Sequence, residues 1–154
     1  MSDKKSLEDL DRDLKKLEQR IESASFAEVL RKDVLPLAIA AVAANFERAT
    51  SPDGASWPAR KVAGDGHPLL DELGALKAAA TGTGPGYVER VTDRELVLGV
   101  DKSVDLGGIP GAGVHNFGFR NIPQREFLGA ADDHLEKLDQ AIADGVEANL
   151  FKDL

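Results

Sequence analysis

The sequence predicts an α+β protein: a small antiparallel β-sheet, made of a hairpin plus a third strand, packed by α-helices. Apolar residues recur every three or four positions in residues 7–21 and again in residues 128–150, which indicates two amphipathic helices near the chain ends. Two short stretches, 87–92 and 95–100, flank the polar pair Asp93-Arg94, which is typical of a β-hairpin. The N-terminal helix is additional to the fold, so we divide the chain into a heptad helix, 1–24, and a single α+β domain, 25–154.

Composition limits the function classes. The chain has 154 residues, a net charge of −8 and no cysteine, which excludes disulfides and thiol chemistry. Residues 130–154 hold seven acids and two lysines, a net charge of −5. An acidic chain without a basic stripe argues against tight general binding to nucleic acid. No apolar run approaches the ~20 residues of a membrane span, and the first residues lack a signal-peptide pattern, so we expect no membrane association.

The N-terminal helix is expected to begin at Ser6, a good N-cap residue, with Asp9 three positions later. Its apolar residues form a strict heptad seam, and they are Leu7, Leu10, Leu14, Leu17 and Ile21. The other faces carry charges of mixed sign, as on a solvated coiled-coil surface. The seam is short for an independent coiled coil, so we expect it to pack on the domain or on a neighbouring subunit.

A second helix is expected from Phe26 to about Ala49. Ser25 and Glu28 have the spacing of a capping box at its start. Pro36 lies inside this helix and predicts a kink or a break near Leu35.

A sharp turn, Ser51-Pro52-Asp53-Gly54, follows this helix and leads to Trp57, the chain's single tryptophan. Trp57 either fills a pocket on its own subunit or docks on a neighbour, and self-packing is the favoured interpretation. A short helix is then expected, with Leu69, Leu70, Leu73 and Leu76 on one face and its end near Ala80.

After the hairpin, residues 101–113 are expected to form a flexible glycine-rich connection. Residues 114–119 are expected to be the third strand, paired with the hairpin. The last helix should be weakened by Gly145, by roughly 1 kcal/mol relative to alanine.

No catalytic pattern is found. The three histidines, His67, His115 and His134, lack the partners of a zinc site, and we expect His115 to be packed and hydrogen-bonded. No serine lies in a G-x-S-x-G elbow. The glycine clusters 82–86 and 108–113 precede predicted strands, where phosphate-binding loops precede helices. We therefore predict no enzyme, no cofactor and no metal site.

Three ordered segments resemble the Mu-type phage virion-morphogenesis and tail-completion family. The first is a helix ending in Asn45-Phe46 followed by S-P-D-G-x-x-W and P-L-L-x-x-x-G-x-L. The second is His115-x-Phe117-Gly118, and the third is Arg125-x-Phe127-Leu128. The resemblance spans roughly residues 26–129. It marks these candidate interface or structural residues: Pro52, Asp53, Gly54, Trp57, Leu69, Leu70, Gly74, Leu76, His115, Phe117, Gly118, Arg125, Phe127 and Leu128.

The resemblance implies a structural protein at the neck or head-proximal tail end of a tailed phage virion, assembled in the host cytoplasm. It implies a homo-oligomeric ring, most often six-fold, that contacts other neck, connector or tail-tube proteins. DNA would only pass non-specifically through the ring, and an acidic surface facing the channel would let it slide. The alternative is a small assembly adaptor or chaperone that acts through its N-terminal helix and leaves the mature particle.

Overall fold

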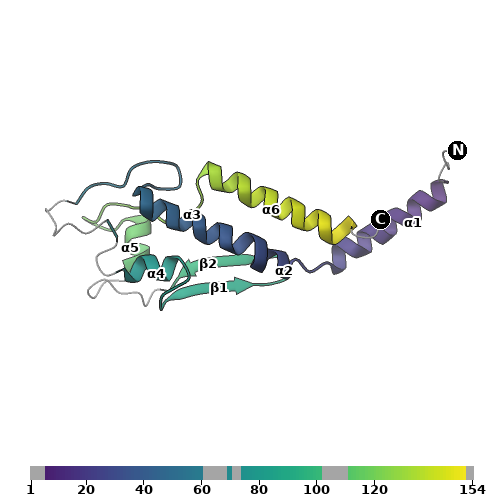
Figure 1. Cartoon of the computed structure of the whole chain (residues 1–154), viewed down its shortest axis with the longest axis horizontal. Helices are drawn as coiled ribbons and strands as arrows, with labels where there is room; N and C mark the ends of the chain where they lie inside the picture. Colours follow the sequence, from purple (N-terminus) through teal and green to yellow (C-terminus); the bar gives the residue numbers. More distant parts are fainter. Residues whose placement is uncertain (1–5, 61–68, 71–73, 102–110, 152–154) are drawn as a thin grey trace.

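A computed structural model describes residues 6–60, 69–70, 74–101 and 111–151. In this part of the chain a long helix, α3, lies between the C-terminal helix, α6, and a two-stranded sheet (Figure 1). Two short helices, α4 and α5, lie at one end of this body, and α1 projects from the other end. The elements are α1 (Leu7–Ser23), α2 (Ala27–Val29), η1 (Leu30–Val34), α3 (Leu35–Arg48), α4 (Ala75–Ala80), β1 (Tyr87–Val91), β2 (Leu96–Val100), α5 (Gly111–Phe117) and α6 (Asp132–Phe151).

The N-terminal helix α1 begins where the sequence predicts. The Asp9 N–H donates to Ser6 Oγ at 3.1 Å, and the Ser6 N–H donates to Asp9 Oδ2 at 3.1 Å, which completes a capping box. Hydrogen bonds join the C-terminal end of α1 to the body: Arg20 Nη1 donates to Leu150 O, and Arg94 Nη2 donates to Ile21 O. No residue of α1 is buried, so the helix extends away from the core.

The predicted capping box at Ser25 is wrong. Ser25 Oγ donates to Asp93 Oδ1 at 2.6 Å, and the Phe26 N–H donates to Asp93 O at 2.7 Å. Glu28 pairs with Lys32 instead of reaching back to the start of the helix. The hairpin turn therefore holds Ser25 and Phe26 through Asp93, and α2 begins at its N-cap residue, Phe26, without a side-chain cap.

The interruption expected near Leu35 is a π-helical turn rather than a break. Residues Leu30–Val34 form η1, and the Leu35 N–H donates to Leu30 O, five residues earlier. In an α-helix the ring of Pro36 would clash with the carbonyl four residues before it, and the wider π turn relieves that clash. The helix consequently continues through Pro36 into α3 without losing its direction (Figure 1).

The hairpin is confirmed. β1 and β2 pair antiparallel from Tyr87 opposite Val100 to Val91 opposite Leu96, and the Thr92 N–H donates to Glu95 O to close the turn. The third strand is wrong, because residues 111–117 form helix α5 and the described residues contain a two-stranded sheet. Gly111 and Ala112 are buried at the start of α5. Their small size lets this helix approach the core closely.

The start predicted for α4 is also wrong. Leu70 has φ 62° and Gly74 has φ 68°, both in the left-handed region, so no right-handed helix can pass through them. The helix begins at Ala75 and ends at Ala80, as expected for its end. Leu69 and Leu70 are partly buried and pack against the core from a turn. Leu73 and His67 lie outside the described residues.

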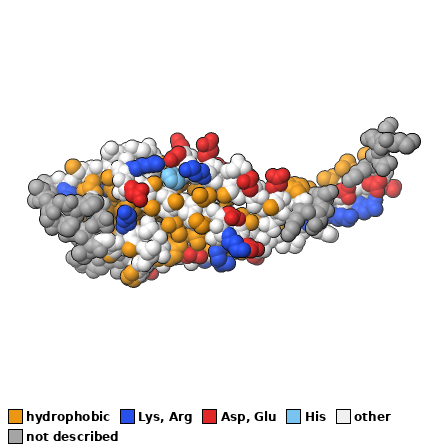
Figure 2. All heavy atoms as spheres, viewed as in Figure 1, with side chains coloured by type: hydrophobic (Ala, Val, Ile, Leu, Met, Phe, Trp, Pro, Cys, Tyr) orange, Lys and Arg blue, Asp and Glu red, His pale blue; other side chains and the backbone are white. Residues whose placement is uncertain are grey.

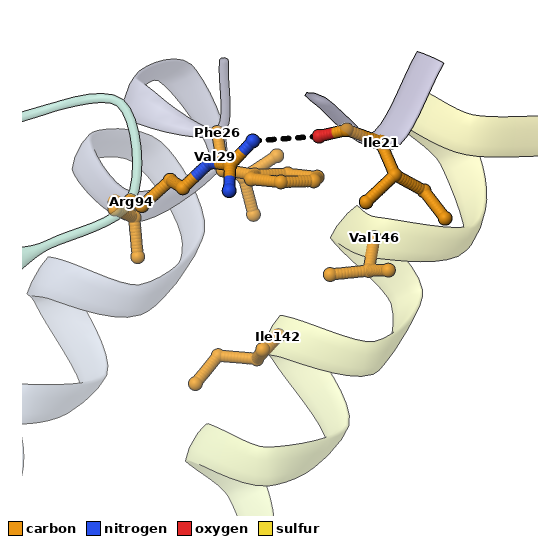
Figure 3. A pocket seen from close by; sticks show the side chains of 7 residues that line it. Ile21, Phe26, Val29, Arg94, Ile142 and Val146 are labelled. Atoms are coloured by element: carbon orange, nitrogen blue, oxygen red, sulfur yellow. Dashed lines mark hydrogen bonds between the residues drawn. The ribbon is translucent and has the colours of Figure 1, made fainter. Parts of the chain in front are cut away.

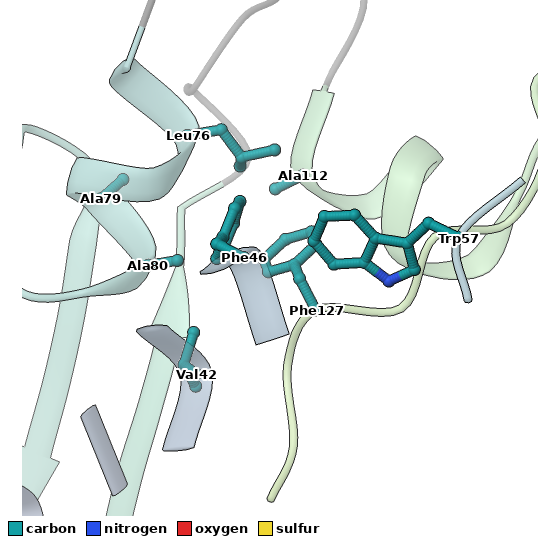
Figure 4. Packing of buried hydrophobic residues seen from close by; sticks show 8 residues of the cluster. All are labelled: Val42, Phe46, Trp57, Leu76, Ala79, Ala80, Ala112 and Phe127. Atoms are coloured by element: carbon teal, nitrogen blue, oxygen red, sulfur yellow. The ribbon is translucent and has the colours of Figure 1, made fainter. Parts of the chain in front are cut away.

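The core lies between α3, α4, α5 and the segment before α6 (Figure 4). The Phe46 ring meets the Trp57 ring edge-on at 5.6 Å between centroids, and its centroid lies 5.3 Å from that of Phe127. Trp57 is 5% exposed, which confirms the expected self-packing. The buried cluster comprises Val42, Phe46, Trp57, Leu76, Ala79, Ala80, Ala112 and Phe127.

Candidate assembly surfaces

The three segments quoted for the family resemblance meet in one hydrogen-bonded unit. Asn45 Nδ2 donates to the carbonyl oxygens of Phe127, at 3.1 Å, and Gly129, at 3.0 Å. Trp57 Nε1 donates to Glu126 O at 3.0 Å. The end of α3 and the tryptophan loop are thus both fixed to the segment that precedes α6. These buried polar groups are satisfied by backbone partners, as a stable core requires.

Helix α5 holds the other side of the same segment. Asn116 Oδ1 accepts hydrogen bonds from the N–H groups of Phe127 and Leu128, each at 3.1 Å. The Arg125 N–H donates to His115 O at 2.7 Å. Asn116 is 5% exposed. Its side-chain oxygen accepts backbone hydrogen bonds from this extended segment, as the carbonyl groups of a neighbouring strand would. No role was predicted for Asn116, because a buried amide that pairs with distant backbone has no local signal in the sequence.

Arg125 carries a buried charge, with 6% of the residue exposed. Its Nε donates to Pro58 O at 2.9 Å and its Nη2 donates to Ala59 O at 3.2 Å, so it anchors the loop after Trp57. Burial lowers the pKa of the Arg125 guanidinium, and the charge of Arg60 lowers it further. Arg125 therefore has a structural function within this unit.

His115 lies beside this cation. Burial lowers the pKa of the His115 imidazole, and the Arg125 charge adds to that effect, so the neutral ring is favoured. His115 is partly buried, in keeping with the expectation that it is packed. Its Nδ1 is fully buried and has no hydrogen-bond partner within the described part of the chain, contrary to the expected hydrogen bond.

The remaining candidate residues form turns around this unit. The Gly54 N–H donates to Ser51 O at 2.9 Å, and Asp53 Oδ1 accepts from the Ala55 N–H, which closes the turn at Pro52. Gly118 adopts φ 74°, where its backbone lies close to Gln124. Leu76 and Phe127 are fully buried and Leu128 is partly buried, so these three serve the core.

One large apolar candidate residue is exposed and suited to an interface. Phe117 is 74% exposed at the end of α5, and Phe119 is 52% exposed two residues later. The Arg120 guanidinium carbon lies 5.1 Å from the centroid of the Phe119 ring. The turn is tight: Phe119 and Ile122 exchange backbone hydrogen bonds, and Arg120 has φ 53°. We call Phe117, Phe119 and Arg120 the aromatic tip. Exposed aromatic and arginine side chains are enriched in protein interfaces.

A second exposed apolar surface lies at the opposite end, on α1 (Figure 2). Leu7 is 85% exposed, Leu14 56% and Leu10 50%. Apolar side chains gather along one edge of α1, with charged side chains on the opposite edge. We call the five heptad residues Leu7, Leu10, Leu14, Leu17 and Ile21 the α1 seam.

The α1 seam runs into an apolar groove of about 280 Å³ (Figure 3). Ile21 belongs to both. Ile142 and Val146 line the groove from α6, and the Arg94 guanidinium, bonded to the carbonyls of Ile21 and Glu22, is the charged group in its lining. The full lining is Ile21, Phe26, Val29, Leu30, Arg94, Ile142 and Val146. The sequence pattern did not predict this groove, because it forms between helices far apart in the chain.

Among the described residues, no cluster of histidine, aspartate and glutamate side chains could hold a metal ion. Within the same residues, no helix is long and apolar enough to cross a membrane. No protein-family model, curated protein or solved structure matches the chain.

Proposed function

We propose that the protein is a structural component of a tailed phage or prophage particle, located at the neck or the head-proximal end of the tail. Copies of the chain form a ring, hexameric by family resemblance, that completes the tail or joins head to tail. The partners are the chain itself and neighbouring neck, connector or tail-tube proteins. DNA passes through the ring without sequence-specific contacts. The protein has a structural function and no enzymatic one.

One observation carries this proposal: exposed apolar surfaces lie at both ends of an elongated body (Figures 1 and 2). The aromatic tip is at the α5 end, and the α1 seam with its groove is at the other. A neck component contacts neighbouring copies of itself and other neck proteins, so each subunit needs more than one contact surface. The joining of the three resembling segments into one unit is a second support, since it makes them a single structural feature.

Light scattering of the purified chain over a range of concentrations tests the ring. A species of hexamer mass favours it. The Phe117→Ser variant should lower that mass if the aromatic tip is a ring contact, and it should leave the fold intact because the side chain is 74% exposed. Val88→Ser is a control, since Val88 is an exposed apolar residue of β1, 37% exposed, that belongs to neither surface. A monomer at every concentration would raise the adaptor function described below to equal standing.

The face of the subunit that lines the DNA path gives a further test. Helix α6 carries six acidic residues and one lysine, a net charge of −5, and acidic side chains follow its outer edge (Figure 2). We propose that this face lines the DNA path, where like charge keeps the DNA from adhering. A structure of the assembled ring with α6 wholly on the outside would contradict this.

An assembly adaptor or chaperone is the second candidate, and the exposure of α1 favours it. A helix with no buried residue that projects from the body is suited to bind another protein reversibly. The two functions differ in the composition of the particle. A neck component is present in purified virions in ring multiples, whereas an adaptor is absent from them.

A further inference from the structure

Interactions within α1 provide only part of the stability of this helix. Its capping box and its intrahelical pairs, such as Asp11 with Lys15, support it locally. With 17 residues, α1 is only slightly longer than the ~12–15 residues below which isolated helices are marginal in water, and most helical stability in proteins comes from packing of an apolar face. The α1 seam exposes that face along most of its length, so the seam is suited to a helical partner.

We propose that the α1 seam binds a basic amphipathic helix of another protein, with the apolar groove receiving one of the partner's side chains. This inference deepens the proposed function, because it names the chemistry of the partner at α1. It holds for a neck component and for an adaptor alike.

The charges beside the seam select the partner. In the heptad, Asp11 and Glu18 flank the seam on one side, and Asp13 and Arg20 flank it on the other. Flanking charges in paired helices determine which helices associate and in which direction. Three of these four residues are acidic, so a partner with lysine or arginine beside its own apolar seam meets opposite charge at most positions.

The same charges disfavour pairing of α1 with itself. In a parallel pair, Asp13 of one helix faces Glu18 of the other, and this repulsion occurs twice. In an antiparallel pair, Asp11 faces Glu18 twice, which offsets the attraction between Asp13 and Arg20 on the other edge. Neither arrangement of two copies gains net stabilisation from the flanks. A basic helix does.

A membrane surface is disfavoured by the same reasoning. Helices that lie on anionic lipid carry lysine and arginine on their polar face. The polar faces of α1 hold six acids and four bases, a net charge of −2, and they are Glu8, Asp9, Asp11, Asp13, Glu18 and Glu22 against Arg12, Lys15, Lys16 and Arg20.

The groove extends the binding surface beyond α1. Its lining is almost wholly apolar. It lies next to Ile21, the last residue of the seam, and Ile142 and Val146 line it from α6 (Figure 3). A volume of about 280 Å³ accommodates a leucine or phenylalanine side chain of the docked helix. The seam and the groove together give helix-in-groove recognition, with apolar anchors at helical spacing.

The test uses two labelled peptides of about three heptads. Both carry leucine at the seam positions; one has lysine and the other has glutamate at the flanking positions. Fluorescence anisotropy with the full chain should show binding of the lysine peptide, weakened by salt, and a clear preference over the glutamate peptide. Equal binding of the two peptides would overturn the proposal, and so would no binding of either.

Two variants sharpen the result. Asp11→Lys with Glu18→Lys should weaken lysine-peptide binding on the order of tenfold and reverse the preference, because flanking attractions become repulsions. Leu10→Ser with Leu14→Ser should abolish binding of both peptides while Trp57 emission, which reports the core, stays unchanged. If the charge variant kept the original preference, the flanks would not select the partner.

The ring is tested separately. If the Leu10→Ser, Leu14→Ser variant loses peptide binding and keeps the mass of the assembled species, the peptide site is distinct from the ring contact. If peptide binding holds and the chain is monomeric throughout, the ring fails and the docking site stands. A loss of mass in this variant, with no peptide bound by the parent chain, would show that the seam serves a second copy and would refute the inference.

Discussion

Gly145 of α6 lies directly against the side chain of Val29, so that a Cβ added at Gly145 would overlap Val29 Cγ1. The sequence alone treats Gly145 as a weak point of the helix, to be improved by alanine. The packing reverses that expectation, because the glycine allows α6 to approach α2.

Gly145→Ala should therefore destabilise the protein, by about 1–3 kcal/mol of overpacking less the gain in helix propensity. Gly113→Ala is the matched control: Gly113 is in α5, and a Cβ there meets no atom within 4 Å. It should be neutral or slightly stabilising. Urea denaturation of both variants measures the difference, and a Gly145→Ala protein more stable than the parent would contradict the packing.

Trp57→Ala should lower the free energy of unfolding by about 3–5 kcal/mol, because it leaves a cavity beside Phe46 in the buried cluster. Trp57→Phe should cost less, since it keeps a ring against Phe46 and loses the hydrogen bond from Nε1 to Glu126 O. Thermal denaturation followed by circular dichroism measures both. An alanine variant as stable as the parent would show that Trp57 is not part of the core.

His115 should make stability depend on pH. Its pKa in the folded chain lies below the ordinary value of 6.5, so below about pH 6.5 the unfolded chain binds a proton that the folded chain does not. The free energy of unfolding should fall as pH falls from 7 toward 5, and it should rise again with pH. His115→Gln should flatten that slope. His134→Gln, in which the other described histidine is removed, should retain it.

Tyr87 should titrate well above a free tyrosine. Burial, together with the hydrogen bond that its hydroxyl donates to Glu89, raises the pKa of its phenol to about 12. Tyr87 is the single tyrosine, so ultraviolet absorbance against pH reports it alone. Glu89→Gln should lower the midpoint while leaving it above 10, since burial remains. A midpoint near 10 in the parent chain would contradict the packing of Tyr87.

Deletion of residues 1–22 should leave a folded domain. None of the deleted residues described in α1 is buried, and the deletion removes a few hydrogen bonds, including the one from Arg20 to Leu150 O. We expect a loss of less than about 2 kcal/mol from them. Unchanged Trp57 emission with a cooperative thermal transition would support this; an unfolded truncation would place the α1 seam in the core.

The sequence predicted elements whose signal is local. The hairpin follows from two short strand-like stretches on either side of a polar turn, and the start of α1 follows from Ser6 and Asp9. The interruption at Pro36 was predictable because proline acts on its own helix. The burial of Trp57 was also expected, although the identity of its partners was not.

The wrong predictions arise where contacts between segments far apart in the chain determine the local structure. Residues 114–119 are too short for periodicity to separate strand from helix, and buried Gly111 and Ala112 favour a helix against the core. Ser25 is drawn to Asp93, which is 68 residues away in the chain. The aromatic tip and the groove depend on which side chains the fold leaves exposed. No pattern within one segment contains that information.

The π turn at Leu30–Val34 determines how the side chains of α2 are rotated about the helix axis relative to those of α3. It contains one residue more per turn than an α-helix would, and each residue of an α-helix advances the side-chain direction by about 100°. Loss of a single residue from this turn would restore regular α-helix, yet it would swing Phe26 and Val29 around the axis relative to Val42 and Phe46. Helix α1 would then project from the core in a different direction. A length change of one residue here is therefore a change of shape: it would re-aim α1 and move Val34, which is buried, and Val29, which lies against Gly145, while the cluster around Phe46 stays in place.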